Sequence, residues 1–382
     1  MKKYQDSFLK DCIKFAEKDL KPFAASFDEK GVLKKSLIQK LSKKGYLGAT
    51  FPESLGGLEL DQVNYGLLTE ELGKACNNTR SLLTVQVSLV GESIIKWGSK
   101  EQINRWIPEM IKGSKIAAFA LTEPNHGSDA HSIETIYIKD GNNFILNGYK
   151  KWISFAAIAD IFLVFARNNE SITAFIVDKE MQGVSIRPMT GLLGSRASHV
   201  AEIELNNVRV PTENVIGEIG SGFKDVATFA LDNGRYSVAW AGVSLSQAAL
   251  EAMVSYSRNR SQFGEKLRSF QMIKQLIGDG VTNTHAARAL CLKAGKSRDQ
   301  KDSNAQIETS IAKYFCSKVA TEVTSNALQV HGGNGCYNKF PVERYFRDAK
   351  ILEIIEGTSQ IQAQIIASYG IQNYFIRNYP SN

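Results

Sequence analysis

Residues 116–129 read IAAFALTEPNHGSD, and the hydrophobic pattern of the chain changes where this stretch begins. Before it, apolar residues recur three and four positions apart, as in SLIQKLSKKGYLG (36–48) and INRWIPEMIKG (103–113). That spacing is typical of amphipathic helices. After it, short β-branched and aromatic runs follow one another between turn residues, which is typical of strands. The stretch therefore marks a change from helices to a sheet.

The runs after this point predict a small β-sandwich or β-barrel over residues 116–226. They are IAAFALT, IETIYI, FILN, IFLVFA, ITAFIVD, VSIRP and VAEIEL. Asp140-Gly141 and Asn206-Asn207 have the residue types that favour turns, so we expect turns between strands at both places.

Helical periodicity flanks this region on both sides. In residues 1–115 it is interrupted by FPESLGG (51–57), which we expect to form a loop. In residues 227–382 it returns, and KSRDQKDSN (296–304) is expected to be a polar connection between two long helices. The sequence thus predicts an α+β multi-domain chain with an N-terminal helical domain (1–115), a middle β domain (116–226) and a C-terminal helical bundle (227–382). A doubly wound nucleotide-binding fold is disfavoured, because no strand is followed by GxGxxG.

Composition excludes several classes of protein. The chain has 382 residues, 43% hydrophobic and 22% charged, which is typical of globular proteins and not of disordered or fibrous ones. No apolar run approaches the ~20 residues of a membrane span. The first residues, MKKYQDSFLKDCIKFAEKDLK, have the pattern of an amphipathic helix and lack the apolar core of a signal peptide.

The five cysteines are odd in number and contain no CxxC pair, which argues against a disulfide framework and a zinc site and favours the cytoplasm. The five histidines share no ligand spacing, so we expect no metal. We also expect no nucleic-acid partner.

The formal net charge is +7, from 46 basic and 39 acidic residues. Part of the excess lies in an early lysine cluster made of Lys34, Lys35, Lys40, Lys43 and Lys44. These lysines form either an ordinary solvated helix face or a surface that attracts an anionic partner, such as a coenzyme A phosphate or an acidic carrier protein.

Two segments of the β region contain residues suited to binding a cofactor. The turn after the first run exposes backbone N–H groups near Ser128, which suit a phosphate or a polar ring edge, although most such turns bind nothing. NGYKKWIS (147–154) places Trp152 near the hydroxyl of Ser154. A flat ring beside a donor suits an isoalloxazine, and a core tryptophan is the ordinary alternative.

Five motifs, in order, resemble those of the acyl-CoA dehydrogenase family along essentially the whole chain. They are ALTEPNHGSD (120–129), NGYKKWIS, a basic segment YSRNRSQFGEKLRSFQ (256–271) interpreted as helical, QVHGGNG (329–335) and RYFRDAKILEIIEGTSQIQ (344–362). The resemblance implies the same three-part fold, and a homotetramer, or alternatively a dimer, with FAD held partly between subunits.

The resemblance also implies roles for individual residues. Thr122 and Ser154 would hydrogen-bond the flavin, Trp152 would pack against it, and Ser128 would lie by the pyrophosphate and the substrate. A second set would reach the adenosine half of the FAD of a neighbouring subunit: Arg260, Gln262, Phe263, Gln271, Gln329, Gly332 and Gly333. Arg260 is chemically suited to a pyrophosphate because its planar fork makes paired charge-assisted bonds. Without the cofactor, a surface salt bridge would be its expected role.

Glu356 matches the catalytic base of the family, and Thr358 and Gln360 match flanking FAD contacts. The α-C–H bond of a thioester is a very weak acid, so its removal needs a positioned base, an oxyanion site at the carbonyl and an acceptor for the β-hydride. A lone Glu before Gly-Thr could equally cap a helix. Asp232, Arg235, Ile355 and Gly357 match positions that shape the substrate pocket.

Some branches of the family carry the base on an earlier helix, and here that position is Gly234, so relocation of the base is not expected. Ile355 stands where the family usually has an aromatic residue, and Cys336 and Lys339 also depart from its pattern. Ile355 alters a wall of the acyl pocket and leaves the chain length undefined, whereas Lys339 either adds a functional positive charge or reflects ordinary surface variation.

The resemblance implies α,β-dehydrogenation of an acyl-CoA, with electrons passed to an electron-transfer flavoprotein. The +7 charge, the early lysine cluster and SLLTVQ (81–86) leave open the same chemistry on an acyl carrier protein. An oxidase that uses oxygen and a non-catalytic binding scaffold are further alternatives.

Overall fold

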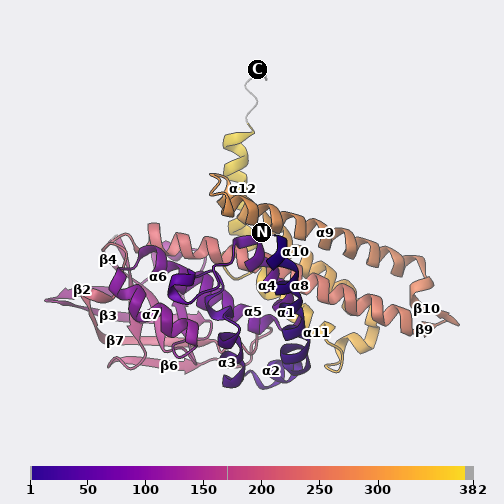
Figure 1. The fold of residues 1–382 in the computed structure, drawn as a ribbon, viewed down its shortest axis with the longest axis horizontal. Helices are drawn as coiled ribbons and strands as arrows, with labels where there is room; N and C mark the ends of the chain where they lie inside the picture. Colours follow the sequence, from indigo (N-terminus) through magenta and orange to yellow (C-terminus); the bar gives the residue numbers. More distant parts are fainter. Residues whose placement is uncertain (1, 170, 375–382) are drawn as a thin grey trace, which may run out of the picture.

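The computed structural model describes residues 2–169 and 171–374. Helices come first along the chain, a sheet follows, and helices return. Figure 1 shows the sheet at one end of an elongated molecule, the first helices in the middle, and long C-terminal helices that reach the other end. The expected α+β architecture is confirmed.

The first part of the chain is helical. Its helices are α1 (Lys2–Phe15), α2 (Ala24–Lys30), α3 (Lys35–Lys43), α4 (Gln62–Ala75), α5 (Asn77–Leu83), α6 (Glu92–Trp97) and α7 (Lys100–Lys112). Asp61 caps α4, because its side chain accepts a hydrogen bond from the N–H of Asn64 at 2.7 Å. A π-helical segment, Thr84–Gly91, joins α5 to α6, and all of its residues are buried. This segment forms one wall of the site described below.

The strands form one mixed sheet that folds back on itself. They are β1 (Ala117–Ala120), β2 (Ile136–Asp140), β3 (Asn143–Ile153), β4 (Ile161–Asn168), β5 (Ser171–Asp178), β6 (Val184–Pro188), β7 (Ala201–Pro211) and β8 (Val215–Ile216). Their order is β6-β7-β3-β2-β4-β5-β8, and β1 pairs with β4 in parallel. The rings of Tyr137, Phe144 and Phe175 meet edge to face with centroids 5.2–5.4 Å apart, which joins the two halves in one core. The prediction of a sheet in the middle part of the chain is confirmed.

One of the two predicted turns is wrong. Asp140-Gly141 does connect β2 to β3, with φ of 58° at Gly141. Asn206-Asn207, however, lies inside the continuous strand β7, where φ of Asn207 is 51° and the register with β3 shifts. Asn147 bonds the backbone N–H of Asn207 at 2.8 Å and stabilises this bulge. Asparagine tolerates positive φ in bulges as well as in turns.

The C-terminal part contains the longest helices. They are α8 (Thr228–Asn259), α9 (Gln271–Asp299), α10 (Ala305–His331), α11 (Val342–Leu352) and α12 (Ser359–Asn373). The predicted polar connection is confirmed, since α9 ends at Asp299 and α10 begins at Ala305.

The prediction of a basic helix over residues 256–271 is wrong for most of its length. Helix α8 ends at Asn259, and a small hairpin of β9 (Ser261–Gln262) and β10 (Glu265–Lys266) follows. Phe263 and Gly264 have φ of 51° and 79°, which a right-handed helix does not allow. The hairpin lies at the end of the molecule opposite the sheet (Figure 1).

Candidate active site

Glu356 lies in the short loop between α11 and α12. Its φ is 54° and that of Gly357 is 85°, so two successive residues adopt the left-handed region. Glutamate adopts it rarely, and such conformations persist where neighbouring structure holds them, often at functional sites. The loop reverses the chain, and Thr358 then caps α12 by accepting a hydrogen bond from the N–H of Ile361 at 3.3 Å. The local fold therefore aims Glu356 back into the protein.

The carboxylate of Glu356 lies against the backbone of α8 at Gly234. A Cβ built on Gly234 would be 2.8 Å from Oε2 of Glu356 and 2.7 Å from Cδ2 of Leu89. Both distances are shorter than real Cβ contacts allow. Glycine at this position thus makes room for the carboxylate between α8 and the π-helical segment.

The main-chain carbonyls of the loop are held by side chains from three helices. Arg235 Nε donates to the carbonyl of Glu356 at 3.1 Å, and Lys313 Nζ donates to that of Gly357 at 2.6 Å. Gln362 Nε2 donates to both carbonyls at 3.3 Å. These bonds fix the peptide planes on either side of the carboxylate.

The surroundings of Glu356 bring the pKa of its carboxyl group close to neutral pH. Burial raises the pKa of Glu356 to about 7, and the charges of Arg235, Lys313 and Arg80 oppose the rise. Burial also lowers the pKa of Lys313 to about 8 and the pKa of Arg235 below its ordinary value. Among the described residues, Glu356 forms no ion pair within 4.0 Å. The carboxylate is therefore free to accept a proton from a ligand.

Sequence reasoning missed Arg80 and Lys313, both of which are fully buried. Polar residues lie near both in the sequence, such as Asn78 before Arg80 and Lys318 after Lys313, so neither cation stands out. The other predicted pocket residues divide: Arg235, Ile355 and Gly357 lie at the Glu356 loop, whereas Asp232 is ion-paired with Arg298.

The predicted flavin contacts of the β domain gather near one another. The N–H of Lys151 donates to the carbonyl of Thr122 at 3.0 Å, which brings Thr122 beside Trp152 and Ser154. Trp152 has φ of 62° and is 52% exposed, so a large ring is held outward at this edge. Ser128 is exposed on the turn after β1.

A buried ion pair anchors that turn. Lys150 Nζ lies 2.7 Å from Glu123 Oε1, and both side chains are at most 1% exposed. Glu123 also accepts the N–H of Thr135 at 2.9 Å, and Lys150 donates to the carbonyl of Leu121 at 3.1 Å. These contacts hold the ALTEP and NGYKKWIS segments next to each other.

The remaining predicted cofactor residues form a second group at the far end. Arg260, Gln262 and Phe263 are exposed on the hairpin, and Phe263 is 95% exposed. The Gly332-Gly333 segment is joined to the same end, because Asn334 Nδ2 donates to the hydroxyl of Tyr256 at 2.8 Å. Gln271 begins α9 beside this hairpin, and Gln329 is exposed near the end of α10. Gln360 lies apart from them, exposed in the first turn of α12.

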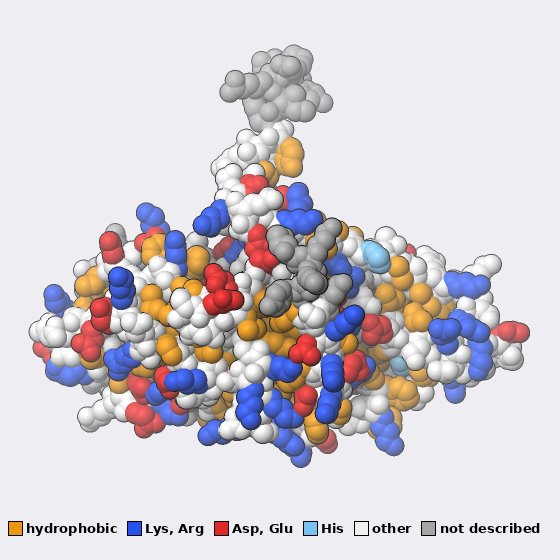
Figure 2. All heavy atoms as spheres, viewed as in Figure 1, with side chains coloured by type: hydrophobic (Ala, Val, Ile, Leu, Met, Phe, Trp, Pro, Cys, Tyr) orange, Lys and Arg blue, Asp and Glu red, His pale blue; other side chains and the backbone are white. Residues whose placement is uncertain are grey.

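The residues around Trp152 in the β domain and those at the hairpin end cannot meet within one chain. Helix α8 separates them, and its 32 residues span roughly 48 Å at 1.5 Å per residue. Basic side chains gather at the hairpin end in Figure 2, where Arg258, Arg260, Lys266 and Arg268 are exposed.

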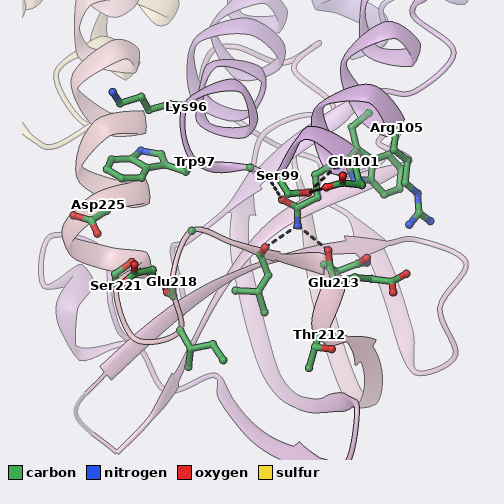
Figure 3. Close-up of a pocket in the computed structure, with 17 residues that line it drawn as sticks. Lys96, Trp97, Ser99, Glu101, Arg105, Thr212, Glu213, Glu218, Ser221 and Asp225 are labelled. Atoms are coloured by element: carbon green, nitrogen blue, oxygen red, sulfur yellow. Dashed lines mark hydrogen bonds between the residues drawn. The ribbon is translucent and has the colours of Figure 1, made fainter.

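A groove of about 1060 Å³ lies elsewhere, between α6–α7 and the segment that contains β8. Figure 3 shows Ser99, Glu101 and Arg105 on one side of this groove and Thr212 and Glu213 on the other. Gln102 Nε2 connects the two sides, since it donates to the carbonyls of Glu213 and Val215 at 2.7 Å. The charged residues that line it are mostly acidic, and none of the predicted site residues lines it. This groove lies at the boundary between the N-terminal helices and the sheet.

Two of the early lysines have partners. Lys40 lies 2.5 Å from Asp19 and Lys44 lies 2.9 Å from Asp11, which fits an ordinary solvated face for these two. Among the described residues, no helix is long and apolar enough to cross a membrane, and no group of three His, Cys, Asp or Glu could hold a metal ion.

Comparison with known proteins identifies similar chains over nearly the full length. Models of the N-terminal, middle and C-terminal domains of acyl-CoA dehydrogenase match residues 2–114, 118–208 and 220–370. The mitochondrial short-chain specific acyl-CoA dehydrogenase of Mus musculus is 37% identical over 95% of this chain and 89% of its own length. The probable acyl-CoA dehydrogenase YngJ of Bacillus subtilis is 38% identical over 92% and 94%. The solved structure of butyryl-CoA dehydrogenase from Megasphaera elsdenii superimposes with a TM-score of 0.93 at 36% identity, over 97% of this chain and 99% of that one.

Proposed function

The chain belongs to the acyl-CoA dehydrogenase family and is a flavin-dependent oxidoreductase of CH–CH bonds, and we propose that Glu356 is the base that removes the α-proton of its acyl thioester. We also propose FAD as the flavin and a short acyl group on coenzyme A as the substrate. The short-chain and butyryl-CoA dehydrogenases among the relatives support the latter. We keep residues 1–115, 116–226 and 227–382 as the proposed domains.

The observation that supports this role for Glu356 is the setting of its carboxylate. It lies against Gly234, takes no part in an ion pair within the described ranges, and has a pKa raised to about 7 by burial. A base that titrates near neutral pH is both deprotonated in a large fraction of molecules and strong enough to receive a proton. A helix cap would not need this position, and Thr358 already caps α12.

The backbone N–H of Glu356 is suited to the thioester carbonyl. In the described part of the chain it donates to no other group, whereas the adjoining carbonyl oxygens are engaged by Arg235, Lys313 and Gln362. A fixed N–H donor that faces the developing oxyanion lowers the barrier without reorganisation. We propose that this N–H binds the carbonyl oxygen of the substrate.

The proposed reaction uses these two groups together. The α-C–H bond breaks, its proton goes to the Glu356 carboxylate, and its electron pair forms the α,β double bond. The flavin supplies the acceptor for the hydride that leaves the β-carbon. Arg235 and Lys313 keep the loop in place while the carboxylate changes charge, because both hold main-chain carbonyls and not the carboxylate itself.

The β domain has features that fit a flavin. Trp152 presents a half-exposed aromatic ring in a backbone conformation that is rare for tryptophan, beside the Thr122 strand end. A flat aromatic ring that is exposed at this edge offers a surface against which another ring can stack. We propose that Thr122, Trp152 and Ser154 hold the isoalloxazine, with Ser128 toward the pyrophosphate and Thr358 and Gln360 flanking it.

The second group of residues supports a multi-subunit site. Since the hairpin end cannot reach Trp152 in the same chain, we propose that Arg260, Gln262, Phe263, Gln271, Gln329, Gly332 and Gly333 contact the FAD of a neighbouring subunit in a homotetramer. The ring of Phe263, 95% exposed, is then covered by assembly.

The electron acceptor is proposed to be an electron-transfer flavoprotein. A relative that is 35% identical over 92% of this chain is a subunit of the caffeyl-CoA reductase–Etf complex of Acetobacterium woodii. We place the reaction in the cytoplasm, because the five cysteines are unpaired in the structure, as expected in a reducing compartment.

Relatives of similar fold differ in the acyl group and its carrier. They include glutaryl-CoA dehydrogenase from Mycobacterium smegmatis (28% identity, TM-score 0.93) and the prolyl acyl carrier protein oxidase AnaB (29%, TM-score 0.92). The second favours an alternative, the same chemistry on a carrier-bound acyl group or with oxygen as acceptor.

Anaerobic titration of the purified flavoprotein distinguishes these possibilities. We expect stoichiometric bleaching of the flavin by an acyl-CoA and slow reoxidation by oxygen. Bleaching by the carrier-bound acyl group alone would establish the alternative carrier, rapid peroxide formation would establish an oxidase, and no bleaching by any thioester would refute the proposal.

A further inference from the structure

His199, near the end of the loop between β6 and β7, makes a hydrogen bond to a distant part of the chain. Its Nε2 accepts the backbone N–H of Leu33 at 2.9 Å, and Leu33 lies in the loop between α2 and α3. A ring nitrogen can accept such a bond only when it carries no proton. The bond therefore requires a neutral imidazole with its proton on Nδ1.

The backbone around His199 holds the turn that follows Trp152. The carbonyl of His199 accepts the N–H of Ala157 at 3.1 Å, and the carbonyl of Ser198 accepts the N–H of Phe155 at 2.7 Å. This turn is therefore fixed by the end of the β6–β7 loop.

The orientation of Trp152 depends on the strand that begins two residues after His199. Lys150 of β3 pairs with Ile203 of β7, and the next pair in the register is Ile153 with Ala201. Two residues of β3 thus face one residue of β7 between these pairs, which makes a bulge that contains Trp152. A bulge of this kind re-aims a side chain, so the direction of the Trp152 ring depends on where β7 begins.

The two bonded segments contain several strained residues. The left-handed region is adopted by Trp152, Phe155, Ser195 and His199, with φ of 62°, 63°, 52° and 46°. Such conformations persist only where the surrounding structure holds them. The contacts that fix residues 195–199, here called the 195–199 segment, therefore also support the turn after Trp152.

Three parts of the chain anchor the 195–199 segment. Asp348 of α11 accepts the N–H of its first residue at 2.6 Å. Asn78 of α5 accepts a backbone N–H and a hydroxyl of the segment, both at 3.1 Å. His199 makes the third contact, to the α2–α3 loop. This third contact is the one that a proton on the ring would abolish.

The charged groups on the elements around His199 have other partners. Lys34 of the α2–α3 loop lies over an aromatic ring at 5.4 Å, and Arg196 donates to a main-chain carbonyl of the β6–β7 loop at 3.0 Å. On α11, Asp348 accepts the N–H already described and Arg347 is ion-paired. The turn over residues 153–158 has no titratable side chain. Burial lowers the pKa of His199 below its ordinary value of 6.5.

We propose that His199 is a positioning residue of the flavin site: its neutral ring joins the α2–α3 loop to the 195–199 segment and so holds Trp152 against the isoalloxazine, and protonation of the ring loosens the flavin. This inference rests on the proposed function, because Trp152 and Ser154 are proposed flavin contacts. A protonated ring would point one N–H at that of Leu33, and two donors without an acceptor do not stay in contact.

The direction of the pH effect follows from the two titrating groups beside the 195–199 segment. Since folding lowers the pKa of His199, the stability that its neutral ring contributes is complete above pH 6.5 and is lost as pH falls below it. Burial raises the pKa of Asp348 to about 6, so that its protonation at low pH favours the folded state. Loosening on acidification therefore has the sign expected for His199 and not for Asp348.

The experiment measures FAD binding by the holoenzyme as a function of pH. Released FAD is detected by its fluorescence after dilution, and visible circular dichroism of the bound flavin reports the surroundings of the ring. We expect the Kd for FAD to increase by roughly 5-fold from pH 7.5 to pH 5.5, the ratio that one hydrogen bond typically produces.

Variants at position 199 separate the hydrogen bond from the charge. His199→Gln supplies an uncharged acceptor oxygen near the position of Nε2, so it should bind FAD within about twofold of the unaltered protein at pH 7.5 and lose the pH response. His199→Asn tolerates the positive φ but is too short to reach Leu33, so it should bind FAD weakly at both pH values. His285→Gln, at an exposed histidine of α9, is the control and should keep the pH response.

The outcomes distinguish this inference from the proposed function. FAD binding that does not change with pH, a His199→Gln variant with the original response, or a His199→Asn variant that binds FAD normally at pH 7.5 would each refute the role of His199 and leave that of Glu356 intact. The expected response in a protein that no acyl thioester reduces would refute only the proposed base. A purified protein that takes up no FAD would refute both. If His199→Asn does not fold, the unaltered protein and His199→Gln still decide.

Discussion

The carboxylate of Glu356 occupies the space that a side chain at Gly234 would need, with Oε2 only 2.8 Å from an ideal Cβ at that glycine. The two positions come from the α11–α12 loop and from the second turn of α8, the chain's longest described helix, and they are 122 residues apart in sequence. A side chain at 234 and the observed position of Glu356 therefore exclude each other. This explains in physical terms why glycine at 234 accompanies glutamate at 356.

Gly234→Ala should displace the carboxylate while leaving the cofactor in place. A base moved by about 1 Å loses on the order of 100-fold in rate. We expect flavin reduction by acyl thioester to slow by about that factor, with unchanged flavin content. Rapid mixing under anaerobic conditions measures the rate.

Gly278→Ala is the matched control, because Gly278 lies in α9 and a Cβ there meets nothing within 4 Å. It should leave the rate unchanged and stabilise the helix by up to ~1 kcal/mol. Equal rates for Gly234→Ala and the unaltered protein would show that the carboxylate does not act from its observed position.

The rate of flavin reduction should increase with pH through a midpoint near 7. The carboxylate must be deprotonated to act, and burial raises the pKa of Glu356 to about 7. The charge of Lys313 lowers that pKa, so Lys313→Met should move the midpoint to higher pH. A pH profile of single-turnover rates measures both.

The same pKa predicts a stability effect with a defined sign. A carboxyl group whose folded pKa exceeds its ordinary value of 4.5 contributes stability below pH 4.5 that is lost as pH increases through about 7. Glu356→Gln should therefore raise Tm at pH 8 more than at pH 5. If Lys313→Met leaves the midpoint of the pH–rate profile unchanged, this electrostatic description of Glu356 is contradicted.

The change from helix to strand near Ile116 could be predicted because β-branched runs with period 2 differ strongly from helical spacing. The error at Asn206-Asn207 arose because asparagine supplies positive φ both to turns and to bulges, and only pairing with β3 distinguishes them. The hairpin at residues 261–266 was missed because its basic composition also suits an exposed helix. Gly264 was the one local sign of it.

The candidate site, like the fold, could be predicted from the sequence only in part. Glu356, Arg235 and Gly234 could be named from motifs, whereas their packing depends on two segments that meet only in the folded chain. Arg80 and Lys313 could not be placed, because polar residues surround both in the sequence. Cationic side chains in such a setting usually reach solvent or a carboxylate, and these two do neither.

Lys150→Met should destabilise the β domain and release the cofactor. Removing one partner of a buried ion pair costs about 3 to 5 kcal/mol, because Glu123 is left charged and buried. We expect a clearly lower Tm and a reduced flavin content. Lys151→Met removes a partly exposed pair with Glu202 and should cost at most about 1 kcal/mol. Equal Tm values for the two variants would mean that the buried pair does not anchor the turn.

Phe263→Ser should weaken the homotetramer. The ring is 95% exposed in the single chain, and the proposed assembly covers it beside the FAD of a neighbour. Light scattering after size-exclusion chromatography should show smaller species with less bound flavin. Ile138→Ser, at an exposed position of β2, should change neither. A Phe263→Ser variant of unchanged mass and flavin content would exclude the hairpin from the interface.

Glu356→Gln keeps the size of the side chain and removes its capacity to accept the proton. Under anaerobic conditions, the variant should bind flavin and acyl thioester as the unaltered protein does, yet reduce the flavin at least ~100-fold more slowly, as expected when a general base is lost. A variant that bleaches at the original rate would show that another group removes the α-proton.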